Sequence, residues 1–405
     1  MSGLWRVRAA VCGVSAVLLM TACGADPRVP PATGTSPATA AAGRRPVSRV
    51  AATIEIEKQG ILVVDSAASM LYVVSEGSVL FIDTNTRQVA GKVDLGGRPG
   101  SAVLDPEAGV LYVAQDAGTV SAIDVATRKV RATIAVGESP GELVLDAAAH
   151  TLYVANYGVD QADGPSVSVI DTVRQQAVST ITIGVTRTAD GGDFSNMGPM
   201  FLDPAGHALY VRGGILSVVD TRKRKVVSKH KIAENGGGTV LDPGAHALFL
   251  RGPRDGMAVF DTSARKIVAS IKAPSMGQLI LDPAGHVLYV GDRDGTVSVI
   301  DTMGQKVTGT FPAGPLVFWA GVVDPEVNAL YLFQPGKISP GAGGRDTVTV
   351  IDTATRQVIG RIPVGAEGPL TMEFPLVFGV VDPATGVVYV ECLLANTPAI
   401  QILQA

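Results

Sequence analysis

Residues 281–302 read Leu-Asp-Pro-Ala-Gly-His-Val-Leu-Tyr-Val-Gly-Asp-Arg-Asp-Gly-Thr-Val-Ser-Val-Ile-Asp-Thr, and this order of short motifs recurs along most of the 405-residue chain. Each copy opens with an aspartate that follows a short apolar run, and these aspartates are Asp65, Asp105, Asp146, Asp203, Asp242, Asp282, Asp324 and Asp382. Their successive spacings are 40, 41, 57, 39, 40, 42 and 58 residues. A period near 40 residues built from short strand-like runs is typical of a β-propeller.

One repeat contains four runs with the pattern of a strand. In residues 141–184 the run 142–145 is mostly apolar, as expected for a buried inner strand, and 151–155 is similar. The runs 166–170 and 177–183 alternate with period two, which indicates half-buried strands. The repeated aspartates begin Asp-Pro and Asp-Thr turns, in which the carboxylate bonds nearby backbone. We therefore expect one antiparallel four-stranded blade per repeat, with the aspartates in turns rather than in catalysis.

The repeat count predicts how the ring closes. Seven repeats are complete, and an eighth supplies strands at 377–381, 387–391 and 399–403 but lacks its fourth. Residues 50–56 resemble the missing strand. We predict an all-β fold of eight blades, closed by strand 50–56 pairing with strand 399–403, which removes exposed sheet edges. Seven blades is the alternative, because related propellers often have seven.

The repeat resembles a known family. Leu152-Tyr153-Val154-Ala155-Asn156, followed by Ser166-Val167-Ser168-Val169-Ile170-Asp171-Thr172 and Ile181-Thr182-Ile183-Gly184, is similar to the YVTN family of β-propeller repeats. The resemblance covers residues 50–405. It implies a secreted or surface-attached protein, but it implies little about chemistry, because propellers serve as enzymes, receptors and scaffolds.

The first 22 residues have the pattern of a secretory signal. Arg6 and Arg8 precede an apolar run at 9–20, and Met20-Thr21-Ala22-Cys23 resembles the lipobox of a bacterial lipoprotein. The resemblance implies cleavage before Cys23, a fatty-acylated (palmitate-type) Cys23 and export to the outer face of the cell membrane. An ordinary cleaved signal and an uncleaved anchor are the alternatives, although the apolar run is shorter than the ~20 residues that span a bilayer.

The residues after the signal predict a tether. Residues 23–49 are rich in proline, alanine, threonine and serine without hydrophobic periodicity, so we assign them as disordered and 50–405 as the propeller. Removing Arg6 and Arg8 leaves 31 of the 33 basic side chains against 37 acidic ones, a net charge of −6. This charge argues against nucleic acid as a partner. We expect a monomer. Apart from Cys23, the mature chain has one cysteine, Cys392, so no disulfide forms within it.

Two repeats are longer than the others at the same two connections. The third repeat is enlarged between its second and third strands and before the next repeat, and the seventh is enlarged at both equivalent places. Antiparallel strands bring both kinds of connection to one face. The third and seventh repeats are four apart, so on an eight-blade ring they lie diametrically opposite each other. We therefore predict two opposed pairs of long loops across one mouth of the channel.

Loops on a rigid scaffold often carry function, so the candidate ligand-binding residues come from these and neighbouring connections. They are Asp163, Asp190, Asp193, Asn196, Phe318, Trp319, Arg345, Glu367, Glu373 and Phe374. Acidic groups with an aromatic rim suit a cationic ligand, a peptide or a sugar. Asp190-Gly191-Gly192-Asp193 could give oxygens to Ca²⁺ or another divalent metal, and a solvated glycine-rich loop is the alternative. No other cofactor is predicted.

The histidines argue against several enzyme classes. His150, His207, His246 and His286 occupy one turn position in consecutive repeats, and His230 is expected to be exposed on an outer strand. This leaves no convincing Ser-His-Asp set, and no Cys-x-x-Cys-His motif for a c-type haem is present. The sequence therefore favours an envelope binding module for a peptide, glycan or protein. A lactonase-like metal-assisted hydrolase or lyase at the channel mouth and a purely structural spacer are the alternatives.

Overall fold

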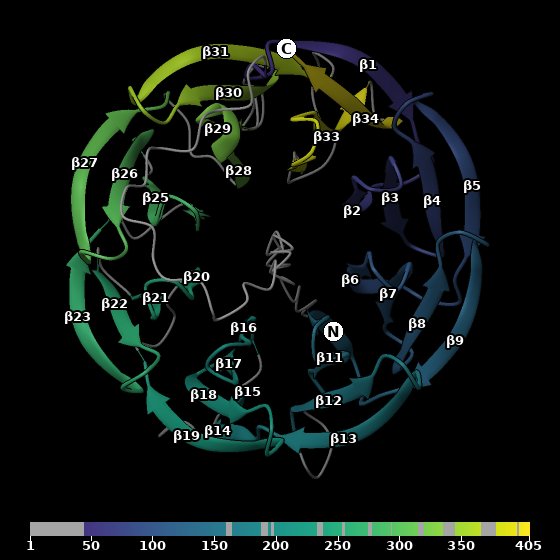
Figure 1. Cartoon of the computed structure of the whole chain (residues 1–405), viewed down its shortest axis with the longest axis vertical. Helices are drawn as coiled ribbons and strands as arrows, with labels where there is room; N and C mark the ends of the chain where they lie inside the picture. Colours follow the sequence, from purple (N-terminus) through teal and green to yellow (C-terminus); the bar gives the residue numbers. More distant parts are fainter. Residues whose placement is uncertain are drawn as a thin grey trace, which may run out of the picture.

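The computed structural model describes residues 44–158, 164–187, 193–195, 198–232, 238–252, 256–273, 278–292, 294–314, 320–334, 345–365, 378–394 and 397–405, with the side chains of 185–187 and 193–195 left undescribed. In these residues the strands form eight antiparallel four-stranded sheets, arranged as blades around a central axis (Figure 1). The eight-blade prediction is confirmed and the seven-blade alternative is wrong.

Each blade runs from its inner strand to its outer strand in chain order, except the last. Blades 1 to 4 are β2 (Gly60–Asp65), β3 (Met70–Ser75), β4 (Ser78–Asp83) and β5 (Gln88–Asp94); β6 (Pro99–Asp105), β7 (Val110–Gln115), β8 (Thr119–Asp124) and β9 (Lys129–Ala135); β10 (Pro140–Asp146), β11 (Thr151–Asn156), β12 (Ser166–Asp171) and β13 (Gln176–Thr182); β16 (Met200–Asp203), β17 (Ala208–Arg212), β18 (Ile215–Asp220) and β19 (Lys225–Lys231). Between blades 3 and 4, β14 (Val185–Arg187) and β15 (Asp193–Ser195) form a two-stranded hairpin.

The remaining blades follow the same plan. Blades 5 to 7 are β20 (Thr239–Asp242), β21 (Ala247–Arg251), β22 (Gly256–Asp261) and β23 (Lys266–Lys272); β24 (Leu279–Asp282), β25 (Val287–Gly291), β26 (Thr296–Asp301) and β27 (Lys306–Pro312); β28 (Ala320–Asp324), β29 (Ala329–Gln334), β30 (Asp346–Asp352) and β31 (Gln357–Val364). A short 3₁₀ helix, η1 (Pro325–Val327), forms the turn after β28. No helix in the described part of the chain is long and apolar enough to cross a membrane.

Blade 8 is built from both ends of the propeller. Its strands are β32 (Phe378–Val381), β33 (Val388–Leu394), β34 (Thr397–Gln404) and, outermost, β1 (Arg49–Glu55). β1 pairs antiparallel with β34 from Arg49 opposite Gln404 to Glu55 opposite Ala399. The predicted closure is therefore confirmed, and no single stretch of sequence contains the whole blade.

The repeated aspartates act in turns, as predicted. Asp65 Oδ1 accepts a hydrogen bond from the Ala68 N–H at 3.0 Å, and Asp203 Oδ1 accepts one from the Gly206 N–H at 2.8 Å. Asp83 does the same in a turn between third and fourth strands, accepting from the Thr86 N–H at 2.8 Å. These bonds between the carboxylates and the backbone hold the chain in its turns.

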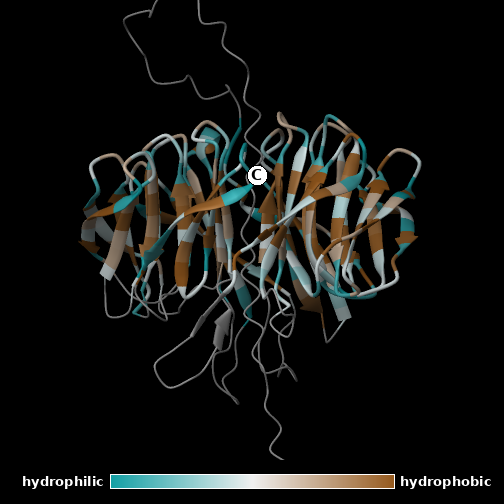
Figure 2. Cartoon of the chain, turned by 90° about the horizontal axis from the view of Figure 1, so that it is seen from below, coloured by the Kyte–Doolittle hydropathy of each residue, from teal (hydrophilic) through white to brown (hydrophobic). Residues whose placement is uncertain are grey.

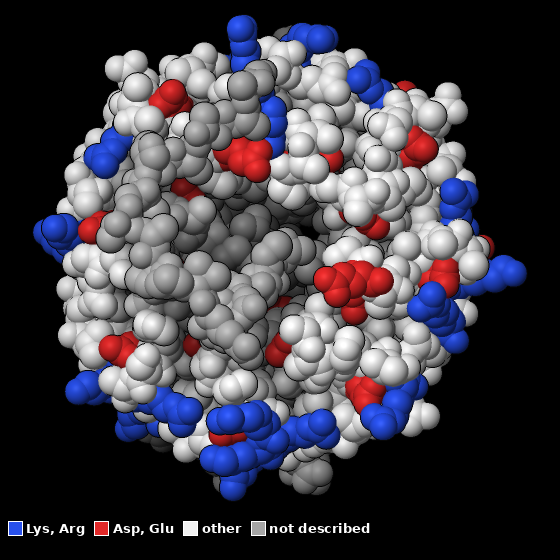
Figure 3. Space-filling model, viewed as in Figure 1, with Lys and Arg blue, Asp and Glu red and all other residues white. Residues whose placement is uncertain are grey.

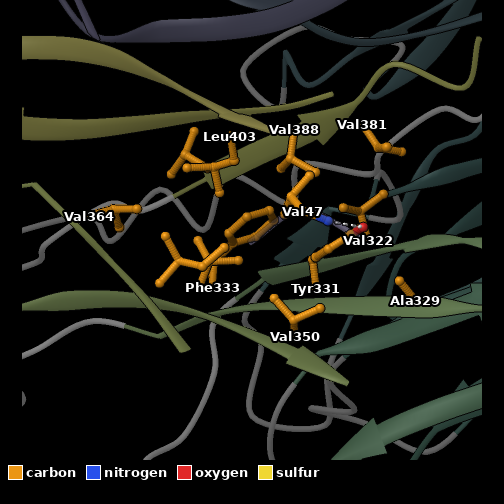
Figure 4. Close-up of a cluster of buried hydrophobic side chains, with 13 residues drawn as sticks. Val47, Val322, Ala329, Tyr331, Phe333, Val350, Val364, Val381, Val388 and Leu403 are labelled. Carbon is orange, nitrogen blue, oxygen red and sulfur yellow. Dashed lines mark hydrogen bonds between the residues drawn. The ribbon is translucent and has the colours of Figure 1, made fainter. Parts of the chain in front are cut away.

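The core lies between the blades rather than within them. Eight apolar clusters each join two neighbouring blades. Figure 4 shows the cluster at the junction of blades 7 and 8, where Tyr331, Phe333 and Val388 surround Val47 from the chain preceding β1. The Val47 N–H also donates to the Tyr331 hydroxyl at 3.3 Å. Residues 44–48, which we assigned to the tether, therefore begin the folded body.

The disc has two unlike faces, seen edge-on in Figure 2. We call the turn face the one that carries the turns from first to second and from third to fourth strands in each blade. The loop face carries the connections from second to third strands and from blade to blade. Arg44, where the described chain begins, lies on the turn face, because its guanidinium bonds Asp324 Oδ2 at 2.5 Å and the Pro383 carbonyl at 2.9 Å.

Candidate binding face

Two successive residues at the end of each second strand decide what the blades present near the loop face. Counting the residue equivalent to Leu152 as one, position four holds Val74, Ala114, Ala155, Arg212, Arg251, Gly291, Phe333 and Glu391. Position five holds Ser75, Gln115, Asn156, Gly213, Gly252, Asp292, Gln334 and Cys392.

Position five is a structural position in several blades. The buried Asn156 donates from Nδ2 to Ser166 Oγ at 3.1 Å and to Ser168 Oγ at 2.9 Å, which ties the second strand of blade 3 to the third. A hydrogen bond of 2.5 Å likewise joins the side chains of Gln115 and Ser121 in blade 2. These hydrogen bonds offset part of the cost of burying the two amides.

Position four breaks the rule of the repeat in three blades. Val74, Ala155 and Phe333 belong to the apolar clusters between blades, as strand alternation requires. The same position is charged at Arg212, Arg251 and Glu391. These three residues lie at strand ends outside the long loops, so the sequence predictions did not include them. Aligning the eight repeats on Leu-Tyr-Val would have revealed them.

Arg251 is the most unusual of the three. It ends β21, is 5 % exposed, and its Nε and Nη2 atoms have no hydrogen-bond partner within the described residues. Burial, and then the positive charge of Arg212, lower the pKa of Arg251 to about 10. Burial also lowers the pKa of Arg212, which ends β17 of the preceding blade. The two cationic side chains thus repel each other near the loop ends of blades 4 and 5.

Glu391 lies across the ring from this pair, because blade 8 is opposite blade 4. The side chain is 2 % exposed, and its Oε1 accepts from the Gly60 N–H at 2.7 Å. Burial raises the pKa of Glu391 to about 7, against the opposing effect of that hydrogen bond. The carboxyl therefore exchanges a proton near neutral pH inside the junction of blades 8 and 1.

Of the predicted ligand-binding residues, only Arg345 has a described side chain. It is exposed, and its Nε donates to the Gly365 carbonyl at 2.8 Å, which ties together the ends of the two enlarged connections of blade 7. Asp193 lies in β15 opposite Arg187, which places it in the hairpin on the other enlarged repeat. The rest lie outside the described residues, as does Cys23: Asp163, Asp190, Asn196, Phe318, Trp319, Glu367, Glu373 and Phe374.

The two enlarged repeats do lie opposite each other. They form blades 3 (β10–β13) and 7 (β28–β31), which are separated by half of the ring in Figure 1. Their connections leave the blades on the loop face. Whether the candidate residues there form one site stays a prediction.

The histidines differ in role from one another. His286 does more than fill a turn, because its Nδ1 lies 3.0 Å from Asp242 Oδ2 of the neighbouring blade. The expectation that His230 is exposed was wrong: it is half-buried with its ring edge-to-face against Phe260, 4.9 Å between centroids. Within the described ranges, no three His, Cys, Asp or Glu side chains come together as metal ligands would.

Fold and face together define the chain as an eight-bladed β-propeller whose turn face and loop face carry different connections. No protein-family model matches it, and no curated protein matches it in sequence. Solved structures share its fold. BamB from Moraxella catarrhalis aligns with a TM-score of 0.61 at 14 % identity, over 89 % of this chain and 100 % of BamB.

Two further solved structures are similar to it. The dihydro-heme d1 dehydrogenase NirN, in complex with DHE, aligns with a TM-score of 0.61 at 15 % identity, over 86 % of this chain and 76 % of NirN. A chain of Kuenenia stuttgartiensis hydrazine synthase aligns with a TM-score of 0.50 at 20 % identity, over 74 % and 97 % of the two chains. At these identities the similarity concerns the fold alone.

Proposed function

We propose that this protein is an exported, lipid-anchored β-propeller of the YVTN type that binds a peptide, glycan or protein partner in the cell envelope through its loop face. The observation that carries the proposal is the position of Arg44. The described chain begins on the turn face, so a tether from an acylated Cys23 joins the ring on the side away from the enlarged loops. The loop face is then turned from the membrane and open to a partner.

The BamB likeness is compatible with this proposal but does not carry it, because it concerns the fold only. The closed ring supports it further. Each of the eight blades is a complete four-stranded sheet, so the described body presents its connections on a rigid frame. This is the usual arrangement for recognition by loops.

A partner-capture experiment tests the binding role. Residues 159–163 and 335–344, which lie in the second-to-third strand connections of blades 3 and 7, are replaced together by Gly-Ser segments in the full chain. Material captured from membranes is then compared with the unchanged protein. We expect specific captured species to disappear. A capture pattern unaffected by the replacement would refute the loop face as the binding surface.

A labelling experiment tests the orientation. Glu107→Cys lies on the β6–β7 turn of the turn face, and Glu138→Cys lies on the β9–β10 connection of the loop face; both side chains are exposed. In the membrane-attached protein, a bulky membrane-impermeant maleimide should modify the loop-face cysteine faster than the turn-face one. Equal rates, or the reverse order, would show that the ring does not stand with its loop face outward.

A further inference from the structure

Comparison of the eight blades shows what position four of the second strand requires. Five blades place a small or apolar residue there, namely Val74, Ala114, Ala155, Gly291 and Phe333. Consecutive blades 4 and 5 place arginine there instead. When a local rule of a fold is broken without structural gain, the site is expected to be functional.

Strand alternation places the two arginines on either side of blade 5. Arg212 shares its face of the sheet with Tyr210, which packs between blades 4 and 5. Arg251 shares its face with Phe249, which packs between blades 5 and 6. Each of the two junctions that flank blade 5 thus carries one arginine near the loop face, and we call this part of the ring the blade 5 sector.

Polar atoms in this sector are buried without partners. Arg251 is 95 % buried, and neither Nε nor Nη2 has a hydrogen-bond acceptor in the described chain. No ion pair joins it to a described carboxylate. Thr239 Oγ1 on β20 is also buried and has no hydrogen-bond partner among the described residues, and Thr239 lies opposite Leu250, the residue before Arg251. An uncompensated buried charge is among the most costly features that a fold can contain.

We infer that the loop end of blade 5 binds a compact oxyanion, a carboxylate or phosphate group, with Arg251 as its principal donor and Arg212 as a second source of positive charge. The planar guanidinium suits two oxygens of one such group. The inference rests on the proposed function and deepens it: the partner or ligand at the loop face presents an anionic group to this sector.

The test measures thermal unfolding of the full chain in non-ionic detergent, in sodium phosphate or sodium acetate against sodium chloride at constant ionic strength. The variants are Arg251→Met, Arg251→Lys and Arg212→Met. The control is Arg222→Met, an exposed arginine of the β18–β19 turn. Figure 3 shows Lys and Arg side chains gathered over these two strands, so the control removes a cation from a basic surface.

We expect a saturable rise in melting temperature with phosphate or acetate in the unchanged protein. The affinity should fall at least about tenfold in Arg251→Met, because charge-assisted hydrogen bonds are lost, and should be intermediate in Arg251→Lys. Arg222→Met should bind as the unchanged protein does. Without added oxyanion, Arg251→Met should melt at a higher temperature than the unchanged protein, since an unpaired buried charge is removed.

Two results would overturn the inference. The first is an equal rise in melting temperature in Arg251→Met and in the unchanged protein. Phosphate stabilises many proteins that have no specific site for it, and an equal rise would be of that kind. The second is no oxyanion dependence together with a lower melting temperature for Asp255→Asn or Asp292→Asn. Asp292 is position five of blade 6 and Asp255 follows Arg251 by four residues, so that result would identify an internal counter-ion.

The test of the oxyanion site and the partner-capture test of the proposed function can fail independently. If loop replacement abolishes capture but Arg251→Met binds oxyanions normally, the binding role stands and the oxyanion site falls. If capture survives loop replacement while oxyanion binding depends on Arg251, the site stands and the proposed partner surface falls.

Discussion

Glu391 and Arg251 occupy the same position of the repeat, and burial shifts their pKa values in opposite directions. In each case it disfavours the charged form, so the pKa of the acid rises and that of the base falls. A pair of opposite charges at one junction would relieve both costs. The ring instead holds them in blades 8 and 5, which are not neighbours, so neither charge offsets the cost of burying the other.

We expect Glu391→Gln to remove a pH dependence of folding. The folded pKa is about 7 against 4.5 for the ordinary group. Since the folded pKa is raised, the native state holds a proton that the unfolded state has lost, and stability falls as pH rises from 4.5 to 7. The loss amounts to about 3 kcal/mol, complete above pH 7. Glutamine keeps an acceptor for the Gly60 N–H without a charge.

Denaturant unfolding from pH 4.5 to pH 8 measures this effect. The variant should be the more stable protein at pH 8 and should show a flatter profile than the unchanged chain. Glu76→Gln, at an exposed glutamate, is the matched control. Parallel profiles for Glu391→Gln and the unchanged chain would contradict the prediction.

Cys392 should be inert to thiol reagents in the folded protein. It is 1 % exposed, and burial raises its pKa to about 12, so the reactive thiolate is scarce. Modification by a small maleimide should therefore follow global unfolding and increase sharply across the denaturant transition. Rapid labelling of the native protein would indicate that the junction of blade 8 opens locally.

At the scale of the element, β1 determines whether the ring is closed. It supplies the outer strand of blade 8, and the residues before it add Val47 to the core of the junction with blade 7. Arg44 holds the same segment in place through ion pairs with Asp324 and Glu326. The side chain of Asp324 is only 2 % exposed, and that of Glu326 is about half exposed. Closure therefore depends on contacts made by a segment of about a dozen residues.

Arg44→Met is predicted to destabilise the fold by about 3 kcal/mol, because it leaves the buried Asp324 without its cation. The matched control is Arg174→Met, which breaks the ion pair with Asp171 where the arginine is 72 % exposed. That change should cost no more than about 0.5 kcal/mol. Chemical unfolding of both variants at pH 7 makes the comparison. Equal small losses would show that Arg44 is not a structural clamp.

The elements were more predictable than the site, for physical reasons. Hydrophobic alternation and Asp-Pro turns are local signals, and every blade repeats them, so strand 50–56 could be matched to the gap in blade 8. Arg251 carries no local signal: an arginine at a strand end is ordinary until its neighbours bury it. His230 was misplaced for the same reason, since Phe260 of another blade covers it.

At the scale of the whole molecule, the two ends of the propeller meet. The Ser48 N–H donates to the Gln404 carbonyl at 2.9 Å. We expect a circular permutant that joins residue 405 to residue 44 through a short Gly-Ser linker, and begins at Lys58, to fold into the same ring. Blade 8 would then be continuous in sequence. Circular dichroism and a single unfolding transition test this, and a loss of cooperative unfolding would contradict it.

The same junction decides how the molecule responds to force. A load on the chain before residue 44 would reach β1 at Arg49, the end that pairs with Gln404, and would open the ladder with β34 one hydrogen bond at a time. Arg44 and Val47 precede that ladder in the chain, and their contacts would transfer part of the force to blades 7 and 8. A protein held by its N-terminus thus has its mechanical weak point and its reinforcement side by side, and rupture there would leave seven four-stranded blades and a three-stranded blade 8.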